Sequence, residues 1–212
     1  MPSAERLDAI TVDAFGTLVE LGEPYERLRT ALAERGVERD RETVAKAFAA
    51  EVAYYLPRAH EGSDAESLAH LRRDCAAVFL DAAGVSLDPD EFAAAYVASL
   101  GFRPLPGSES ALERLQAAGL VLACVSNWDV SLPDQLAGIG LARLFAAVVS
   151  SAEAGAPKPD PRPFELALAK VGVEPGRALH VGDSDADRDG AAEAGLAFEP
   201  APLATLPARL GL

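Results

Sequence analysis

The segment ITVDAFGTLVEL, residues 10–21, decides how the rest of the sequence is interpreted. Four of the five residues in 11–15 are apolar or β-branched, a composition typical of a buried strand. Asp13 interrupts this run, and Gly16-Thr17 then predicts a turn. A strand directed into a core that ends on a carboxylate suggests either a functional group or a cap for the following turn.

The composition is that of a globular protein with a substantial core. Half of the 212 residues are hydrophobic and a quarter are charged, which suits one domain with an elaboration or two modest domains. The formal net charge of -14 argues against nucleic-acid partners. Cys75 and Cys124 lie among apolar neighbours, which predicts buried thiols rather than a disulfide framework or a zinc site.

No targeting or membrane segment is predicted. The N-terminus lacks a basic stretch followed by a long apolar one, and no apolar run approaches the ~18 residues of a membrane span. We therefore expect a cytoplasmic protein without membrane partners. The sequence does not indicate an oligomeric state.

Two kinds of periodicity divide the chain. Between residues 24 and 100, apolar residues recur at steps of three and four, which predicts four helices in a small bundle. From residue 105 onward, helices alternate with apolar strands expected at 120–126, 145–151 and 178–183, which predicts an α/β fold with a doubly wound parallel sheet. The first helix of this part is expected to have Ser108 as its N-cap and to end at Gly119.

These patterns predict two domains. An α/β core domain is expected over residues 1–20 and 101–212, and a helical cap domain over residues 21–100. The first strand is thus separated from the others by a helical insertion. A short strand and a terminal helix are expected after Gly195.

Polar side chains stand at the carboxyl ends of the predicted strands, where open parallel sheets bind their ligands. These residues are Asp13 after the first strand, Ser126 and Asn127 after the second, Lys158 after the third, and Asp183, Asp185, Asp187 and Asp189 after the fourth. Each alone has an ordinary explanation as a turn residue, a solvated loop lysine or a helix N-terminus. Their recurrence at consecutive strand ends favours one site.

Here the sequence resembles the haloacid dehalogenase-like (HAD) hydrolase superfamily over nearly its whole length. DAFGTL resembles the Asp-led first motif of the family, VSNWD the second, the lysine of APKPDP the third, and GDSDAD the acidic fourth. The helical insertion between the first two motifs also matches. The resemblance implies a Rossmannoid hydrolase with a helical cap, acting on a small molecule.

The resemblance also implies a nucleophile and a metal site. Asp13 would attack the substrate and form a covalent intermediate. Mg²⁺ would be held by Asp13, Asp183 and the backbone carbonyl of Phe15, with Asp187 orienting its water ligands.

Further residues would bind the substrate. Ser126 and backbone N–H groups would hold phosphoryl oxygens, and Lys158 would neutralise charge. The neighbouring candidates for substrate binding are Gly16, Thr17, Asn127 and Trp128, although packing is the alternative for Trp128. In the predicted cap, Arg27, Arg29, Arg58, Arg72 and Arg73 could reach an anionic group, but most are expected to be solvated. His180, inside a strand, is expected to be a hydrogen-bonded core residue.

Phe15 departs from the pattern of the family's phosphatases. There a second Asp stands two residues after the nucleophile and acts as general acid and base, a contribution of about 10²–10⁴ in rate. The family's 2-haloacid dehalogenases have an aromatic residue there and need no metal, but their fourth motif differs from GDSDAD and they carry a Tyr where this chain has Phe164.

Three hypotheses follow. The first is a Mg²⁺-dependent hydrolase of small phosphorylated or otherwise activated substrates, with Asp129, Asp187 or water transferring the proton. The second is a metal-independent dehalogenase. The third is a non-catalytic, ligand-binding member of the family.

Overall fold

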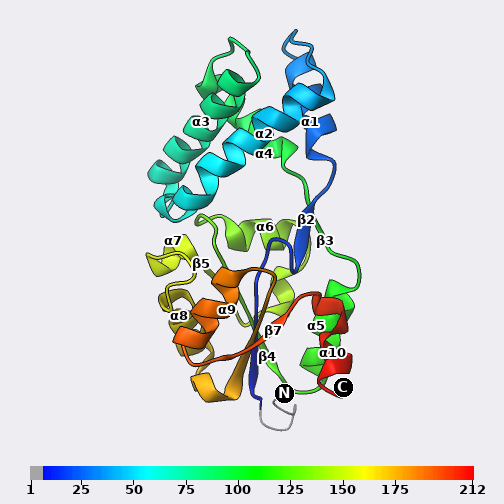
Figure 1. Ribbon diagram of the computed structural model, residues 1–212, viewed down its shortest axis with the longest axis vertical. Helices are drawn as coiled ribbons and strands as arrows, with labels where there is room; N and C mark the ends of the chain where they lie inside the picture. Colours follow the sequence, from blue (N-terminus) through cyan, green and yellow to red (C-terminus); the bar gives the residue numbers. More distant parts are fainter. Residues whose placement is uncertain (1–6) are drawn as a thin grey trace. The chain divides into compact units, whose positions relative to one another are not determined.

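The computed structural model describes residues 7–212, which fall into two compact units (Figure 1). One unit contains the chain as far as Glu20 and again from Arg103 to Leu212. The other is the continuous segment Leu21–Phe102. The second unit is therefore a single insertion in the sequence of the first.

A parallel sheet forms the centre of the first unit. Its strands in the described part of the chain are β1 (Ala9–Val12), β4 (Val121–Ser126), β5 (Ala147–Ser150), β6 (Ala178–Gly182) and β7 (Ala197–Pro200). Their order is β5-β4-β1-β6-β7, and every neighbouring pair is parallel. Thr11 of the central strand β1 stands opposite Ala123 on one side and His180 on the other. The predicted doubly wound parallel sheet is confirmed, and the carboxyl ends of its strands share one edge.

Helices cover both faces of this sheet. They are α5 (Ser108–Ala117), α6 (Leu132–Gly138), α7 (Ser151–Ala154), α8 (Arg162–Val171), α9 (Asp185–Glu193) and α10 (Leu206–Arg209), with short 3-10 turns η3 (Ala142–Leu144), η4 (Pro175–Arg177) and η5 (Leu203–Thr205). Figure 1 shows α8 and α9 on one side of the strands, and α5 and α10 on the other. Because both faces are covered, the strands are continuous apolar runs such as that of β4 rather than alternating patterns.

The packing of α9 depends on a glycine. A Cβ at Gly190 would lie 2.7 Å from the ring of Phe164 on α8 and 2.9 Å from the carbonyl oxygen of Pro159. The absence of a side chain therefore lets α9 approach α8 and the loop before it. Phe164 itself is fully buried between α8 and the sheet.

The second unit is helical. It contains α1 (Pro24–Ala33), α2 (Arg41–Tyr55), the 3-10 turn η2 (Leu56–Glu61), α3 (Ala65–Ala82) and α4 (Pro89–Ser99). Three of its helices begin after an aspartate, Asp40, Asp64 or Asp88, whose carboxylate accepts a backbone N–H of the first turn. These N-caps satisfy donors that have no partner within the helix.

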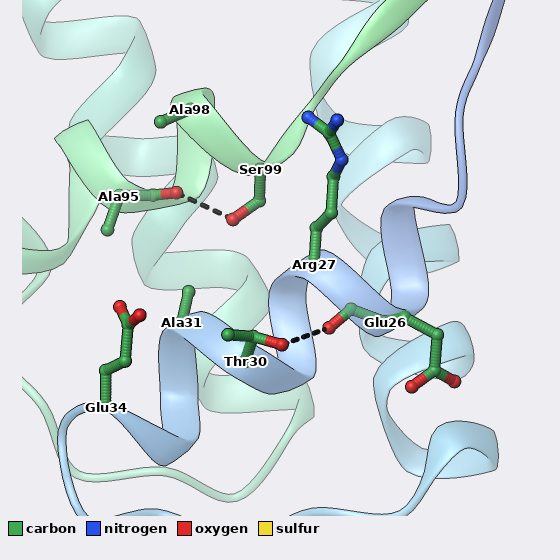
Figure 2. Close-up of a pocket in the computed structure, with 8 residues that line it drawn as sticks. All are labelled: Glu26, Arg27, Thr30, Ala31, Glu34, Ala95, Ala98 and Ser99. Atoms are coloured by element: carbon green, nitrogen blue, oxygen red, sulfur yellow. Dashed lines mark hydrogen bonds between the residues drawn. The ribbon is translucent and has the colours of Figure 1, made fainter.

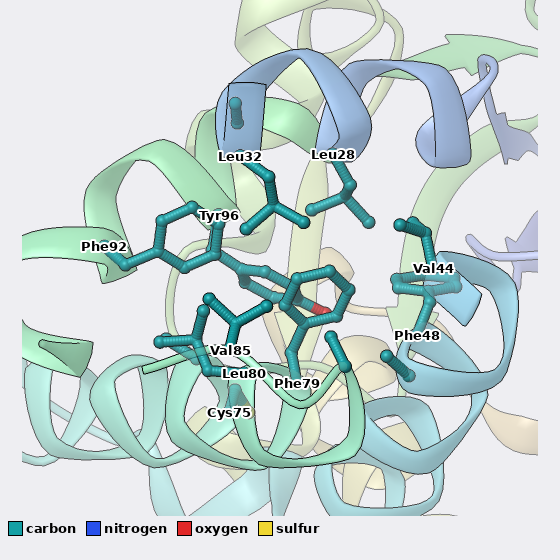
Figure 3. Packing of buried hydrophobic residues seen from close by; sticks show 14 of the residues in the cluster. Leu28, Leu32, Val44, Phe48, Cys75, Phe79, Leu80, Val85, Phe92 and Tyr96 are labelled. Carbon is teal, nitrogen blue, oxygen red and sulfur yellow. The ribbon is translucent and has the colours of Figure 1, made fainter. Parts of the chain in front are cut away.

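The helical unit has its own aromatic core (Figure 3). Phe79 of α3 stacks against Phe92 of α4 at a centroid distance of 6.0 Å and lies 5.2 Å from the ring of Tyr96. Leu28 and Leu32 of α1 close the core, and both are fully buried. Cys75 contributes a buried thiol here that forms no disulfide, as Cys124 does in the sheet, in agreement with the sequence.

The structure corrects several local predictions. The chain segments that join the units form a two-stranded sheet of β2 (Val19–Leu21) and β3 (Phe102–Pro104), which was not predicted. Ser108 is not the N-cap of α5, because Gly107 occupies that position with φ 80° and Ser108 is the first, buried, helical residue.

The end of one predicted strand also differs. The helix α7 begins at Ser151, where a strand was expected to continue. The helix α9 begins at Asp185, inside the acidic run, because Ser184 caps it.

Candidate active site

Asp13 lies directly after β1, at the carboxyl edge of the sheet. Its backbone N–H donates to the carbonyl of Val181 at 2.9 Å, which extends the pairing of β1 with β6. Its carboxylate is buried, and Oδ1 accepts hydrogen bonds from Ser126 Oγ at 2.9 Å and Lys158 Nζ at 2.6 Å. Burial raises the pKa of Asp13, and the ammonium of Lys158 opposes that shift.

Lys158 is a buried ammonium that contacts three acceptors. Its Nζ donates to Asp13 Oδ1, to Asp187 Oδ1 at 2.5 Å and to the carbonyl of Val125 at 3.0 Å. Burial works to lower the pKa of Lys158, but the two carboxylates outweigh it and raise the pKa. The group is therefore charged at neutral pH, and each of its three N–H bonds has an acceptor.

Asn127 holds the loop that carries this lysine. Its Oδ1 accepts the backbone N–H of Lys158 at 2.7 Å, and its Nδ2 donates to the carbonyl of the same residue at 3.1 Å. Both ends of the amide are thus occupied by one backbone segment. The sequence placed Asn127 at a strand end but did not predict this partner.

Asp187 is hydrogen bonded by four donors. Oδ1 accepts from Lys158 and from His180 Nε2 at 3.0 Å, while Oδ2 accepts from the hydroxyl and the backbone N–H of Ser184 at 2.5 and 3.1 Å. Burial works to raise the pKa of Asp187, but His180 and Lys158 outweigh it and hold the pKa well below its usual range. Asp187 is thus an anion whose acceptor positions are filled, and it fixes the position of Lys158.

His180 supports Asp187 from the sheet. Its Nδ1 lies 2.9 Å from Thr11 Oγ1 on the neighbouring strand, and its ring packs edge-on against Phe164. Burial lowers the pKa of His180, so the ring is neutral at neutral pH. With the Thr11 hydroxyl donating to Nδ1, the proton lies on Nε2 and points to Asp187. The expectation of a hydrogen-bonded core histidine is confirmed.

Three carboxylates meet beside Lys158. One oxygen from each of Asp13, Asp183 and Asp187 lies within 4.8 Å of the other two. Asp183 is the exposed member of the cluster, and partial burial together with the charge of Asp187 raises its pKa. Three carboxylates against one ammonium leave two negative charges in excess when all are ionised.

Gly16 allows Asp183 to approach the turn after β1. A Cβ at this position would lie 2.2 Å from Asp183 Oδ2, and Gly16 has φ 86°, a conformation that residues with side chains rarely adopt. The turn is closed by a hydrogen bond of 2.9 Å from the N–H of Gly16 to the carbonyl of Val19. The Gly-Thr pair of the sequence therefore supplies a close backbone approach as well as a turn.

Phe15 and Thr17 flank this glycine and differ in exposure. Phe15 is 49% exposed, although its backbone is fixed by a bridge to Val19. Thr17 is buried, and its hydroxyl has no hydrogen-bond partner among residues 7–212. A buried hydroxyl without a partner is costly and suits a position that a ligand satisfies.

The residues after Asn127 are held within the unit. Trp128 is buried, and its backbone N–H and carbonyl both bond the hydroxyl of Ser151. Asp129 is also buried, and its Oδ1 accepts the backbone N–H and hydroxyl of Ser131 at 2.8 and 2.5 Å.

The helical unit has a groove of about 380 Å³ between α1 and α4 (Figure 2). It is lined by Glu26, Arg27, Thr30, Ala31, Glu34, Ala95, Ala98 and Ser99. The hydroxyls of Thr30 and Ser99 donate to carbonyls of their own helices. Of the predicted anion-binding arginines, only Arg27 lines it.

Other arginines from that prediction have partners within the helical unit. Arg29 pairs with Glu26, and Arg73 pairs with Asp74 and Asp90. Arg58 lies over the ring of Tyr54. These contacts agree with the expectation that most of the arginines do not bind an anion.

The chain matches one protein family over most of its length. Residues 7–195 match the model of the haloacid dehalogenase-like hydrolases, and the chain belongs to this family. The fold is thus the one that the sequence motifs predicted.

Relatives include both phosphatases and dehalogenases. The chain is 50% identical over 80 residues to haloacid dehalogenase-like hydrolase domain-containing protein 3 of Mus musculus, an alignment of 38% of this chain and 32% of that protein. It is 35% identical over 154 residues to a phosphoglycolate phosphatase of Rhodospirillum rubrum, covering 72% of this chain and 56% of that one. The structure of L-2-haloacid dehalogenase from Xanthobacter autotrophicus matches with a TM-score of 0.66 and 27% identity, over 91% of this chain and 76% of that one.

The alignment with the mouse protein spans about a third of that relative's length. Within residues 7–212, none of the helices has the length and apolar character needed to cross a bilayer.

Proposed function

We propose that the chain hydrolyses small phosphorylated molecules through a covalent intermediate on Asp13. The observation that carries the proposal is the set of contacts on Asp13 Oδ1: a hydroxyl and an ammonium hold one carboxylate oxygen of a buried aspartate at the ligand-binding edge of a parallel sheet. Such contacts orient a carboxylate for attack.

The residues present account for the two steps of the reaction. An oxygen of Asp13 attacks phosphorus, and the bond from phosphorus to the leaving oxygen breaks with its electron pair on the leaving group. Water then attacks the phosphorus of the aspartyl phosphate and releases Asp13 as a carboxylate. The fixed charge of Lys158 would offset the negative charge that gathers in both steps. The Thr17 hydroxyl, which has no partner among residues 7–212, would donate to the phosphoryl group.

The acidic cluster fits a divalent cation. Two negative charges in excess, carried by oxygen ligands, are the chemistry that Mg²⁺ prefers. Asp13, Asp183 and the backbone carbonyl of Phe15 would hold the ion, while Asp187, already bonded by four donors, would act on Lys158 and on waters of the ion. When bound, the ion would neutralise charge on the phosphoryl group.

In this proposal, Ser126 and Asn127 position other groups of the site. Ser126 orients Asp13, and Asn127 positions Lys158 through its backbone instead of contacting substrate. Trp128 is buried and its backbone bonds Ser151, so it would serve packing instead of contacting substrate. Gly16 and Thr17 remain the substrate-binding candidates of the turn after β1. The helical unit would serve as the cap that excludes water from the reaction.

Dehalogenation is a second candidate. Phe15 supports it, because a halide leaves carbon without taking a proton and needs no acid at that position. The structural similarity to an L-2-haloacid dehalogenase supports it as well. The acidic cluster weighs against it, since three carboxylates without a cation repel one another.

Calorimetric titration of Mg²⁺ tests the proposal. Wild type is compared with Asp183→Asn and with the control Asp185→Asn, whose carboxylate is 84% exposed and pairs with Arg188. Hydrolysis of p-nitrophenyl phosphate and halide release from 2-chloropropionate are measured on the same samples. We expect binding and phosphate release to be lost only in Asp183→Asn. Halide release without metal binding would instead establish the dehalogenase.

A further inference from the structure

We propose that Phe15 restricts this enzyme to phosphorylated substrates whose leaving group departs as a stable anion: acyl phosphates and aryl phosphates of acidic phenols, but not alkyl phosphates. This inference rests on the proposed function and adds the substrate class to it. An alkoxide, unlike a carboxylate or an acidic phenolate, must receive a proton as it leaves.

The residues that hold Asp13 do not supply that proton. Each N–H of Lys158 has an acceptor, and two of these acceptors are carboxylate oxygens. The hydroxyl of Ser126 donates to Asp13 itself. Both groups therefore stabilise charge and do not protonate a leaving oxygen.

The nearby carboxyl groups do not supply the proton either. Asp187 accepts hydrogen bonds from four donors. Asp129 accepts two bonds from Ser131 in its own turn. Asp183 belongs to the cation site of the proposed function, and a carboxylate bound to a cation is not an acid. The two aspartates that the sequence offered for proton transfer are thus held as acceptors.

Phe15 stands two residues after the nucleophile, on the turn that contacts Asp183 through Gly16. Its half-exposed ring has no proton to give. The bridge to Val19 fixes the backbone of this turn, so the turn that follows Asp13 carries a hydrocarbon ring and no acid at this position.

The chemistry balances without an acid for the proposed class. With acetyl phosphate, the Asp13 oxygen bonds to phosphorus, and acetate leaves with the electron pair of the broken bond. The aspartyl phosphate is itself an acyl phosphate, so water displaces the Asp13 carboxylate in the same way, and the proton of the attacking water passes to the phosphate product or to solvent.

The test measures how kcat/KM depends on the leaving group. The substrates form a series of increasing leaving-group pKa. Acetyl phosphate releases a carboxylate that resembles that of Glu, with a pKa of about 4.3. Phenyl phosphates range from nitro-substituted phenol to unsubstituted phenol, whose pKa is near the Tyr value of about 10, and ethyl phosphate releases an alkoxide. Wild type is compared with Phe15→Asp, which introduces an acid, and with Phe15→Asn, whose side chain has the shape of Asp but cannot transfer a proton. The intact mass of the chain after mixing with acetyl phosphate reports phosphorylation independently of turnover.

We expect kcat/KM of wild type to fall steadily as the leaving-group pKa rises, with ethyl phosphate at least about 10²-fold below p-nitrophenyl phosphate. Phe15→Asp should raise the ratio of ethyl to p-nitrophenyl phosphate by about 10²-fold or more, and Phe15→Asn should not change it. Wild-type rates on these two substrates within about tenfold of each other would overturn the inference while leaving the proposed function in place. No phosphorylated chain and no turnover of any phosphate would refute the proposed function, and the inference with it.

Discussion

Glu51 is a carboxyl group inside the core of the helical unit, and replacing it should alter how stability depends on pH. Its side chain belongs to α2 and is buried with only 4% exposure. Burial raises the pKa of Glu51, more than the neighbouring Tyr96 and Cys75 lower it. The folded chain therefore keeps the Glu51 proton at pH values where the unfolded chain has released it.

The sign and size of the effect follow from proton linkage. Below the ordinary pKa of 4.5, both states carry the proton and Glu51 adds no pH dependence. Above it, the free energy of unfolding falls with rising pH by at most about 1.4 kcal/mol per pH unit, until the raised pKa of the folded state is reached. Glu51→Gln preserves the shape of the protonated acid and carries no charge, so it should lack this slope.

Urea unfolding from about pH 4 to about pH 8 measures the difference. We expect Glu51→Gln to be close to wild type near pH 4, to gain relative stability as the pH rises, and to level off above the folded pKa of Glu51. Glu42→Gln on the same helix is the control, because its exposed carboxylate pairs with Lys46 and the loss of this pair costs roughly a few tenths of a kcal/mol. A difference between wild type and Glu51→Gln that is constant across the range would refute the reasoning.

Three further predictions concern the sheet edge and the helical core. Lys158→Met should lower the free energy of unfolding of the metal-free chain by about 3–5 kcal/mol, because two buried carboxylates lose their counter-ion; a loss below about 1 kcal/mol would contradict this. Gly16→Ala should weaken Mg²⁺ binding at least about tenfold by calorimetry, since its Cβ would displace Asp183, and unchanged affinity would show that Asp183 is not a ligand. Phe79→Ala should cost about 3–5 kcal/mol in urea unfolding, whereas Leu56→Ala, at an exposed position, should change stability by less than about 0.5 kcal/mol; equal losses would contradict the described core.

The sheet was predictable because its strands have a local signature. Apolar runs such as that of β4 and glycine-containing turns such as that at Gly16 are visible in a few consecutive residues. The joining strands β2 and β3 were not predictable, since three residues carry no period and their pairing joins segments far apart in the chain. The error at Ser108 has a similar cause: a serine before a helix suits the N-cap, but Gly107 reaches the required backbone conformation without a side chain.

The candidate site was predicted as a set of positions and not as a set of contacts. Asp13, Lys158 and Asp187 do converge, as their places at strand ends imply. The two hydrogen bonds between the side-chain amide of Asn127 and the backbone of Lys158 were not predicted, because the two residues share no local pattern. The support of Asp187 by His180 was missed for the same reason, since it depends on the register of neighbouring strands.

The ends of the helical insertion meet. In the first unit, Glu20 and Arg103 form an ion pair at 3.0 Å, and in the second the N–H of Gly22 donates to the carbonyl of Gly101 at 2.7 Å. A segment whose two ends are adjacent can be removed, lengthened or exchanged by a single recombination event, while the strands around it keep their register. A chain shortened by a tight turn between Glu20 and Arg103 would retain every strand of the parallel sheet and every member of the acidic cluster. The two units can therefore be inherited and modified as separate modules, and the insertion is a natural exchange point for building chimaeras.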